Sequence, residues 1–383
     1  MADVTPAALD TPQRFRERFP SLADTVHLAS CSQGAASTDL LGASFEFQAT
    51  MREHGAPWDL WVGEVERARS LFAALIGAEP TEIAVVPSAS VGAYQVASTR
   101  SWTTPRVVTT DMEFPSVAQV WHAQCPRGAD IVHATDHDGI VAAEDYAAVL
   151  DERASLVSIP LASYRNGARL PVADVATMAH DVGAHVFVDA YQAAGVLPTD
   201  VHQLGCDYLV SGSLKYLLGL PGIAFLYVRD GVADQVAPQL TGWFGRVDPF
   251  AFDPYAVDFP AAARRFETGT PSIPSAYGAV AGMTALTRVD AKAVDLYVRE
   301  LGAELHANLH RVGERIWSPA DPELRGAQVA VVDDNPTDLA AYLAQRRIVT
   351  SPRGHVIRLS LHYYNDSSDV DAVCAAIADY RRG

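Results

Sequence analysis

The chain has 383 residues, of which 49% are hydrophobic and 20% are charged. These values are ordinary for a globular protein with a sizeable core, and they exclude intrinsic disorder and a collagen-like repeat. Twenty-nine Lys and Arg residues against 46 Asp and Glu residues give a net charge of −17, spread along the sequence. We therefore expect no nucleic-acid partner and no anionic membrane partner. An anionic small molecule must be held by a few local positive groups.

The sequence also predicts the cellular compartment of the protein and the absence of a metal site. The four cysteines (Cys31, Cys125, Cys206 and Cys374) lie far apart and form no C-x-x-C pair. Residues 1–14 lack the apolar stretch of a secretory signal, and no apolar run is long enough for a membrane helix. We therefore expect a cytoplasmic protein with reduced thiols. No metal-ligand spacing of histidines and no glycine-rich nucleotide motif occurs, so we expect no metal site.

Short apolar, β-branched segments alternate with stretches of helical spacing. The expected strands are Glu82–Val86, Val107–Thr110, Asp130–Val132, Leu156–Pro160, His185–Val188, Tyr208–Ser211 and Ile223–Val228, and clear helical spacing occurs in Val65–Ile76 and Val172–Asp181. This alternation predicts an α/β fold with a mainly parallel sheet and helices on both faces. Ligands of such sheets bind beyond the carboxyl ends of the strands.

The pattern changes after about residue 280. A long helix from Ala291 to about Ile316, a strand Gln328–Val332, a helix near Thr337–Gln345, a strand Val356–Leu361 and a helix from Ser368 are expected. We predict a large domain of residues 31–279 and a smaller α+β domain of residues 1–30 and 280–383. Residues 241–274, rich in Pro and Gly, are expected to form a long functional or interface-forming excursion.

The most informative segment is Asp207–Val228, in which a strand leads into Ser-Gly-Ser-Leu-Lys. Lys215 lies between Leu214 and Leu217 in a lysine-poor chain. A single lysine in a loop is ordinarily a surface residue. At the mouth of a parallel sheet, however, apolar flanks lower the pKa of an amine and increase its nucleophilicity, as a Schiff-base lysine requires.

A carboxylate is expected at the same edge of the sheet. Asp189 ends the apolar strand of the segment His185–Gly195. It could cap the following helix, or it could pair with a protonated pyridine nitrogen. An Asp and a Lys arranged in this way are typical of pyridoxal phosphate (PLP) sites.

On these segments the sequence resembles the class V aminotransferase family of fold type I PLP enzymes, which includes cysteine desulfurases, kynureninases, isopenicillin-N-epimerase-like proteins and C–S lyases. The resemblance runs from His27-Leu28-Ala29-Ser30 to Arg358-Leu359-Ser360 and is strongest in Asp-x-x-Gln and Ser-x-x-x-Lys. It implies that Lys215 forms the Schiff base with PLP. It also implies that Asp189 pairs with the pyridinium and that Gln192 hydrogen-bonds the phenolate oxygen of the cofactor.

The resemblance also implies the other cofactor contacts. Ala89 and Ser90 occupy the position of the phosphate-binding turn, where a helix N-terminus attracts anions. The family usually has His or Tyr before the lysine, whereas this chain has Leu214, so Ser211 and Ser213 are expected to compensate. Phe114 occupies the position that stacks on the cofactor ring, and a phenyl group cannot transfer protons.

Further residues are implied for the substrate and for a partner subunit. Arg358 matches the arginine that binds the substrate α-carboxylate as a fork, and Ser30, Ser32 and Gln33 are expected on the substrate side. Thr270 matches the threonine that reaches the phosphate of the neighbouring subunit, which implies a homodimer with shared active sites. Trp243 is expected either near this interface or in the core.

The reaction type stays open among several possibilities. Desulfurases carry a persulfide-accepting cysteine between the lysine and the C-terminal arginine, and this chain has none between Lys215 and Arg358. We therefore reject persulfide transfer and favour β-elimination from a cysteine S-conjugate. Transamination, epimerisation and decarboxylation of an amino acid share the first steps. A non-catalytic protein of this fold is disfavoured, because Lys215, Asp189, Gln192 and Arg358 are all intact.

Overall fold

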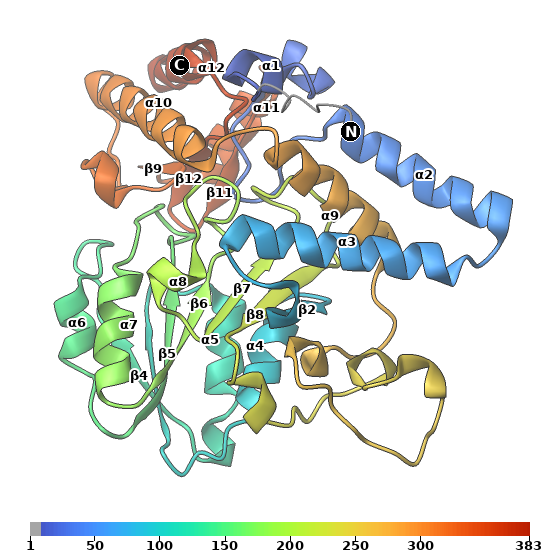
Figure 1. The fold of residues 1–383 in the computed structure, drawn as a ribbon. Helices are drawn as coiled ribbons and strands as arrows, with labels where there is room; N and C mark the ends of the chain where they lie inside the picture. The colour runs from blue at the N-terminus through green and yellow to red at the C-terminus, as the bar shows by residue number, and fades with distance from the viewer. Residues whose placement is uncertain (1–8) are drawn as a thin grey trace.

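The computed structural model describes residues 9–383, so the part of the predicted small domain formed by residues 1–8 lies outside the described residues. A seven-stranded sheet forms the centre (Figure 1), with strand order β2-β8-β7-β6-β5-β3-β4. Its strands are β2 (Ile83–Val86), β3 (Arg106–Thr110), β4 (Asp130–Ala134), β5 (Ala154–Pro160), β6 (His185–Asp189), β7 (Tyr208–Gly212) and β8 (Ala224–Val228). Strands β4, β3, β5, β6 and β7 are parallel, and β8 is antiparallel to both of its neighbours. The predicted α/β fold with a mainly parallel sheet is confirmed.

Both faces of the sheet are buried under helices, because successive strand residues point to opposite sides. One face packs against α3 (Trp58–Ile76) and α7 (Val172–Asp181), with the rings of Phe72 and Phe225 stacked at 4.6 Å. The other face packs against α4 (Ala89–Ser98) and α5 (Pro115–His122), where Trp121 meets Phe187 edge-on at 5.2 Å. The apolar strands predicted from sequence are therefore the middle layer of three.

The C-terminal part forms a smaller sheet with its own helices at one end of the large sheet (Figure 1). Its antiparallel strands have the order β11-β12-β9. The elements are β9 (Gln328–Val332), β10 (Ile348–Val349), β11 (Ser351–Arg353), β12 (Val356–Ser360), α10 (Ala291–Arg311), α11 (Pro336–Ala344) and α12 (Ser367–Arg382). Helix α10 ends five residues before the predicted Ile316, and Gly313 with φ +88° lies in the turn that follows.

The N-terminal residues join both parts. Strand β1 (Val26–His27) pairs in parallel with β10, and Arg16 of α1 (Pro12–Arg16) forms an ion pair with Asp369 of α12 at 2.7 Å. Helices α2 (Thr38–His54) and α9 (Ile273–Leu286) pack against each other, and α9 also packs against α3. The sequence pattern did not predict α2, whose N-terminus is capped by Ser37. The predicted boundary after residue 279 falls within α9, so the domain division stays a prediction.

The remaining helices are short and connect the strands of the large sheet. They are α6 (Ala143–Ala147) and α8 (Val201–Leu204). The excursion over residues 241–274 contains 3₁₀ turns, among them Trp243–Gly245, Pro249–Ala251 and Ala263–Phe266. In it, the Trp243 ring packs against Phe244 at 4.5 Å and against Trp58 of α3 at 5.9 Å.

Candidate active site

A cavity of about 230 Å³ opens where β2, β3, β5, β6 and β7 end, at the edge of the sheet where a ligand was expected. Six of the predicted site residues lie in its wall. The full wall consists of Ser88, Ala89, Ser90, Phe114, Ser116, Val117, Pro160, Ala162, Tyr164, Asp189, Tyr191, Gln192, Leu214 and Lys215. The strand ends therefore bring together residues that lie up to 127 positions apart in the sequence.

Lys215 follows β7 and reaches into the cavity between two aromatic rings. Its Nζ lies 4.2 Å from the ring centroid of Tyr191 and 5.3 Å from that of Phe114. Burial lowers the pKa of Lys215 to about 8, and the negative charge of Asp189 opposes this fall. The amine therefore has a neutral, nucleophilic fraction at mildly alkaline pH.

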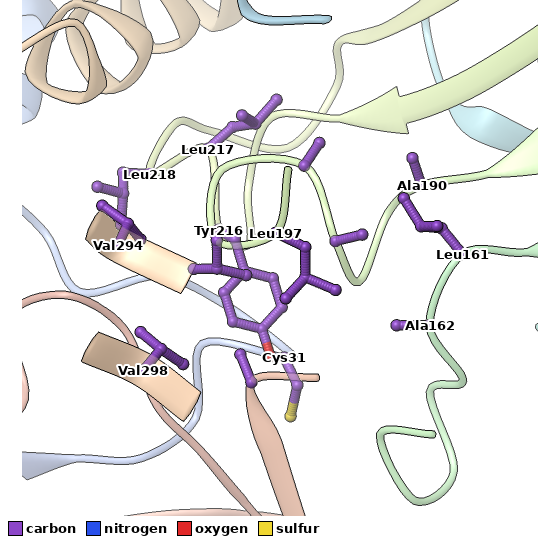
Figure 2. Packing of buried hydrophobic residues seen from close by; sticks show 14 of the residues in the cluster. Cys31, Leu161, Ala162, Ala190, Leu197, Tyr216, Leu217, Leu218, Val294 and Val298 are labelled. Atoms are coloured by element: carbon purple, nitrogen blue, oxygen red, sulfur yellow. The ribbon is translucent and has the colours of Figure 1, made fainter. Parts of the chain in front are cut away.

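The turn that carries Lys215 is fixed on several sides. The amide of Gly34 donates to the carbonyl oxygen of Leu214 at 2.9 Å, and Nε2 of His362 lies 3.0 Å from the carbonyl oxygen of Tyr216. The side chains of Tyr216, Leu217 and Leu218 are buried, and they belong to the same hydrophobic cluster as Val294 of α10 (Figure 2). The lysine is thus anchored by buried residues immediately C-terminal to it.

Asp189 ends β6 and is 5% exposed. Its Oδ1 accepts a hydrogen bond of 2.8 Å from the amide of Tyr191. Burial raises the pKa of Asp189, while this hydrogen bond and the positive charge of Lys215 oppose the rise. A carboxylate in such a place is stabilised by a cationic partner.

Gln192 lies three residues after Asp189, in the turn that follows β6 and in the same cavity wall. Its Nε2 donates to the carbonyl oxygen of Cys31 at 3.1 Å. Its Oε1 is buried and has no hydrogen-bond partner among residues 9–383. A buried polar atom of this kind costs free energy until a ligand satisfies it.

The N-terminus of α4 also lines the cavity. Ser88 caps this helix and accepts a hydrogen bond from the amide of Val91 at 3.3 Å. Ala89 and Ser90, the predicted phosphate-binding residues, form the first turn and line the cavity. Amide groups of a first helical turn attract a phosphate. Ser116, at the start of α5, also lines this region and was not singled out from the sequence.

The structure adds a second carboxyl group, Glu113, whose role the sequence did not reveal. Its Oε1 accepts from the amide of Phe114 at 2.8 Å, and its Oε2 accepts from Oγ of Ser158 at 3.0 Å. Burial, together with the negative charge of Asp189, raises the pKa of Glu113 to about 8. The signal in the sequence that could have identified Glu113 is an acidic residue soon after an apolar strand.

Two predicted serines lie behind the cavity wall. Oγ of Ser213 donates to the carbonyl oxygen of Leu220 at 2.6 Å, and Oγ of Ser211 donates to that of Gly212 at 3.3 Å. Both side chains are buried, and neither lines the cavity. A hydroxyl in a tight turn finds a nearby carbonyl oxygen before it finds a distant ligand. Their assignment as phosphate-binding residues stays a prediction.

The predicted substrate residues are also outside the cavity wall. Arg358 is buried in β12, where its guanidinium donates to Ser351 Oγ at 2.6 Å and to the carbonyl oxygen of Tyr164 at 2.9 Å. Ser30 Oγ lies 2.6 Å from the hydroxyl of Tyr364. Ser32 is half-buried, and the amide of Gln33 donates to the carbonyl oxygen of Ala29 at 3.0 Å. These assignments stay predictions.

Thr270 is exposed and lies apart from Lys215, beside the end of β2.

Among the cysteines, Cys125 is exposed, and Cys31, Cys206 and Cys374 are buried free thiols. Within residues 9–383, no group of three or more His, Cys, Asp or Glu side chains is arranged to hold a metal ion. None of the helices in that part of the chain is long and apolar enough to cross a membrane.

The cavity fits PLP in four respects. An amine with a lowered pKa, Lys215, and a buried carboxylate, Asp189, lie in one wall. The buried Oε1 of Gln192 lacks a partner, and the α4 N-terminus offers a phosphate site. Together with a mainly parallel sheet covered on both faces, these features define a fold type I PLP-dependent enzyme.

Comparison with known proteins agrees with this class. The family model "Aminotransferase class-V" matches residues 60–373, so the chain belongs to the class V aminotransferase family. An uncharacterised aminotransferase, YcbU, of Bacillus subtilis is 35% identical over 94% of this chain and 95% of its own length. A kynureninase of Pseudomonas fluorescens is 28% identical over 64% of this chain and 62% of its own.

Solved structures share the fold at lower identity. The apo structure of a cysteine desulfurase from Thermococcus onnurineus has a TM-score of 0.89, with 23% identity, 98% coverage of this chain and 100% of that chain. A complex of the cystine C–S lyase C-DES with its reaction product cysteine persulfide has a TM-score of 0.87, with 21% identity, 94% coverage of this chain and 99% of that chain.

Proposed function

We propose that this enzyme catalyses β-elimination from a cysteine S-conjugate. The observation that carries the proposal is the composition of the cavity wall around Lys215, which contains no cysteine and no histidine. The wall therefore offers no thiol that could accept sulfur and no imidazole that could act as a second base. The apolar side chains of Phe114, Val117 and Leu214 suit the release of a thiol. C-DES, which shares the fold, acts as a cystine C–S lyase.

Each residue has a role that its position supports. PLP, when bound, supplies the sink for the electron pair of the Cα–H bond. Lys215 removes the Cα proton with its neutral Nζ, because its pKa of about 8 leaves part of the amine unprotonated. Asp189 keeps the ring nitrogen protonated. The rings of Phe114 and Tyr191 exclude water on either side of the Lys215 amine.

Arg358 holds the substrate α-carboxylate in this proposal. Its Nε and Nη1 donate to the backbone carbonyl oxygens of Ser351 and Tyr164, and Nη2 donates to the Ser351 hydroxyl. A guanidinium has five N–H donors, so two stay available for a carboxylate. The three existing hydrogen bonds fix the plane of the Arg358 guanidinium before the substrate binds.

The proposal is tested by product analysis with the holoenzyme. A cysteine S-conjugate and water should yield pyruvate, ammonia and one thiol in equal amounts. The break of the Cα–H and Cβ–S bonds gives the thiol, and hydrolysis gives the other two products. The variant Lys215→Ala is the control. A panel of S-conjugates that gives neither pyruvate nor thiol excludes β-elimination.

Transamination is the second candidate, because the relative YcbU of Bacillus subtilis is described as an uncharacterised aminotransferase. The same panel with a keto-acid acceptor separates the two reactions. Transamination gives a new amino acid from the acceptor and no free thiol. Epimerisation gives the opposite enantiomer, and decarboxylation gives CO₂, so chiral chromatography and gas release complete the assay.

We also propose a cytoplasmic homodimer in which Thr270 reaches the site of the neighbouring subunit. Thr270 is exposed, and the excursion before it exposes Phe250, Phe252 and Tyr255, the last at 95%. Apolar exposure of this extent is typical of an interface. Mixing inactive Lys215→Ala chains with Thr270→Ala chains tests it, since a shared site regains both residues in the mixed dimer. No recovery of activity contradicts a site shared through Thr270.

A further inference from the structure

Glu113 has no role in the reaction described above, yet it is among the most constrained acidic groups of the protein. It follows β3, is 4% exposed, and both carboxyl oxygens accept hydrogen bonds. One bond comes from the amide of Phe114, which is the cap of α5 and the predicted ring-stacking residue. Glu113 itself is not part of the cavity wall.

The strand register places this carboxyl group beneath Asp189. Ser158 and Pro160 lie two residues apart on β5, so their side chains point to the same face of the sheet. Pro160 pairs with Asp189 of β6, and both line the cavity. Because Ser158 donates to Glu113, the Glu113 carboxyl group lies on the Asp189 face, one step further from the cavity.

Two carboxyl groups that share a dry site cannot both be ionised, so one of them keeps a proton. Asp189 lines the cavity and receives the positive charge of Lys215, and a pyridinium would add a further cation there. Glu113 lies outside the wall, and within residues 9–383 no Lys, Arg or His side chain forms an ion pair with its carboxyl group. The proton therefore belongs on Glu113.

We propose that Glu113 is a positioning residue that stays protonated beneath the cofactor site. It holds the amide of Phe114, and thereby the stacking ring, without adding a second negative charge beside Asp189. Its neighbours agree with this role. Burial and the charge of Asp189 raise the pKa of Glu113 to about 8. The other titratable group that faces it is Tyr146, whose buried hydroxyl lacks a hydrogen-bond partner in residues 9–383.

The variant Glu113→Gln is the decisive one, because an amide imitates a protonated carboxyl group in shape and charge. In the protonated Glu113, Oε1 accepts from the amide of Phe114, and the proton on Oε2 is donated to Oγ of Ser158, whose hydroxyl rotates to accept it. In Glu113→Gln the amide oxygen and the NH₂ group reproduce these two bonds. We expect this variant to bind PLP within about twofold of the wild type, with the same visible absorbance. Glu113→Ala leaves the Phe114 amide unsatisfied and should weaken PLP binding about tenfold or more. Glu144→Gln, at an exposed site on α6, is the matched control.

A second measurement uses the apoprotein and does not depend on activity. The pKa of Glu113 rises from 4.5 in the unfolded chain to about 8 in the folded one. The unfolded state thus loses its proton at lower pH, so the unfolding free energy falls as pH rises from 4.5 to 8. This fall should be smaller in Glu113→Gln than in the wild type and unchanged in Glu144→Gln.

The outcomes separate the two possible charge states whatever reaction the enzyme catalyses. If Glu113→Gln binds PLP as poorly as Glu113→Ala, or keeps the full pH dependence of unfolding, Glu113 is ionised in the native protein and the proposal is wrong. If Glu113→Ala binds PLP as well as the wild type, Glu113 does not position Phe114. Should the alanine variant fail to fold, the glutamine variant decides through both measurements.

Discussion

The amide of Gly34 donates a hydrogen bond of 2.9 Å to the carbonyl oxygen of Leu214, the residue directly before Lys215. A Cβ atom at position 34 would lie 2.5 Å from the carbonyl oxygen of Lys215 and 2.8 Å from Cδ2 of Leu218. Non-bonded atoms do not approach so closely, so only glycine permits this contact. A segment near the N-terminus thus fixes the turn of the lysine, 181 positions later in the chain.

The substitution Gly34→Ala should therefore disturb both stability and cofactor binding. We expect a loss of about 1–3 kcal/mol in the free energy of unfolding, because the new methyl group overpacks the turn. The amount of covalently bound PLP should fall as Lys215 moves. Urea denaturation and the visible absorbance of the purified protein measure the two effects.

Gly42→Ala is the matched control for this prediction. Nothing lies within 4 Å of a Cβ at Gly42 in α2. Alanine in a helix interior is favoured over glycine by about 0.5–1 kcal/mol, so this variant should be at least as stable as the wild type. Equal losses of unfolding free energy and of bound PLP in both variants would show that the close contact between Gly34 and Lys215 does not fix the turn of the lysine.

Covalent attachment of PLP can be assigned to one residue because the sequence contains only two lysines, Lys215 and Lys292. Borohydride reduction followed by proteolysis and mass spectrometry should place the cofactor on the peptide with Lys215 alone. Lys215→Ala should lower kcat by about 10²–10⁴-fold, as expected for loss of a general acid–base group. Lys292→Ala, at an exposed position of α10, should leave kcat unchanged. Label on Lys292 in the native protein would contradict the assignment.

The rate of PLP attachment to the apoprotein should depend on pH through Lys215. Only the neutral amine attacks an aldehyde, and burial lowers the pKa of Lys215 to about 8. The rate should rise with pH and reach half its maximum near pH 8, well below the 10.5 of an ordinary lysine. In Asp189→Asn the midpoint should move lower still, because the charge of Asp189 raises the pKa of the amine. Stopped-flow absorbance gives both midpoints, and a wild-type midpoint above pH 10 contradicts the prediction.

His362 should make the protein sensitive to acid. Its Nδ1 accepts from the amide of Tyr363 at 2.8 Å, so Nε2 carries the hydrogen and donates to the carbonyl oxygen of Tyr216 at 3.0 Å. Burial lowers the pKa of His362 from 6.5 to about 4. The unfolded state therefore takes up a proton first, and the unfolding free energy falls as pH drops from 6.5 to 4.

The variant His362→Leu tests this origin of acid sensitivity. It should reduce the pH dependence between 6.5 and 4, and it should cost about 1–3 kcal/mol at pH 7, because the polar groups of Tyr216 and Tyr363 lose their partner. Chemical denaturation across this pH range measures both effects. His202→Leu, at an exposed position of α8, serves as the control. An unchanged pH dependence in His362→Leu assigns the effect to other histidines.

The sequence by itself determined the class of the fold and the positions of the main site residues relative to its strands. Apolar strands of four to seven residues alternate with helices, so a parallel sheet with ligands at its carboxyl edge follows from local patterns. Lys215, Asp189, Phe114 and Ala89 follow or end such strands or begin the next helix, and all four line one cavity. Their position relative to a strand end is local information.

Only the tertiary structure decided which polar groups face the cavity. Ser213 donates to a carbonyl oxygen of its own turn, whereas Glu113 bonds to Ser158 of another strand. The contact between Gly34 and Leu214, and the one between His362 and Tyr216, join segments more than 140 residues apart. Such contacts depend on the packing of distant elements, and no local periodicity encodes them. The charge states of buried groups follow from the same packing, since burial and neighbouring charges set each pKa.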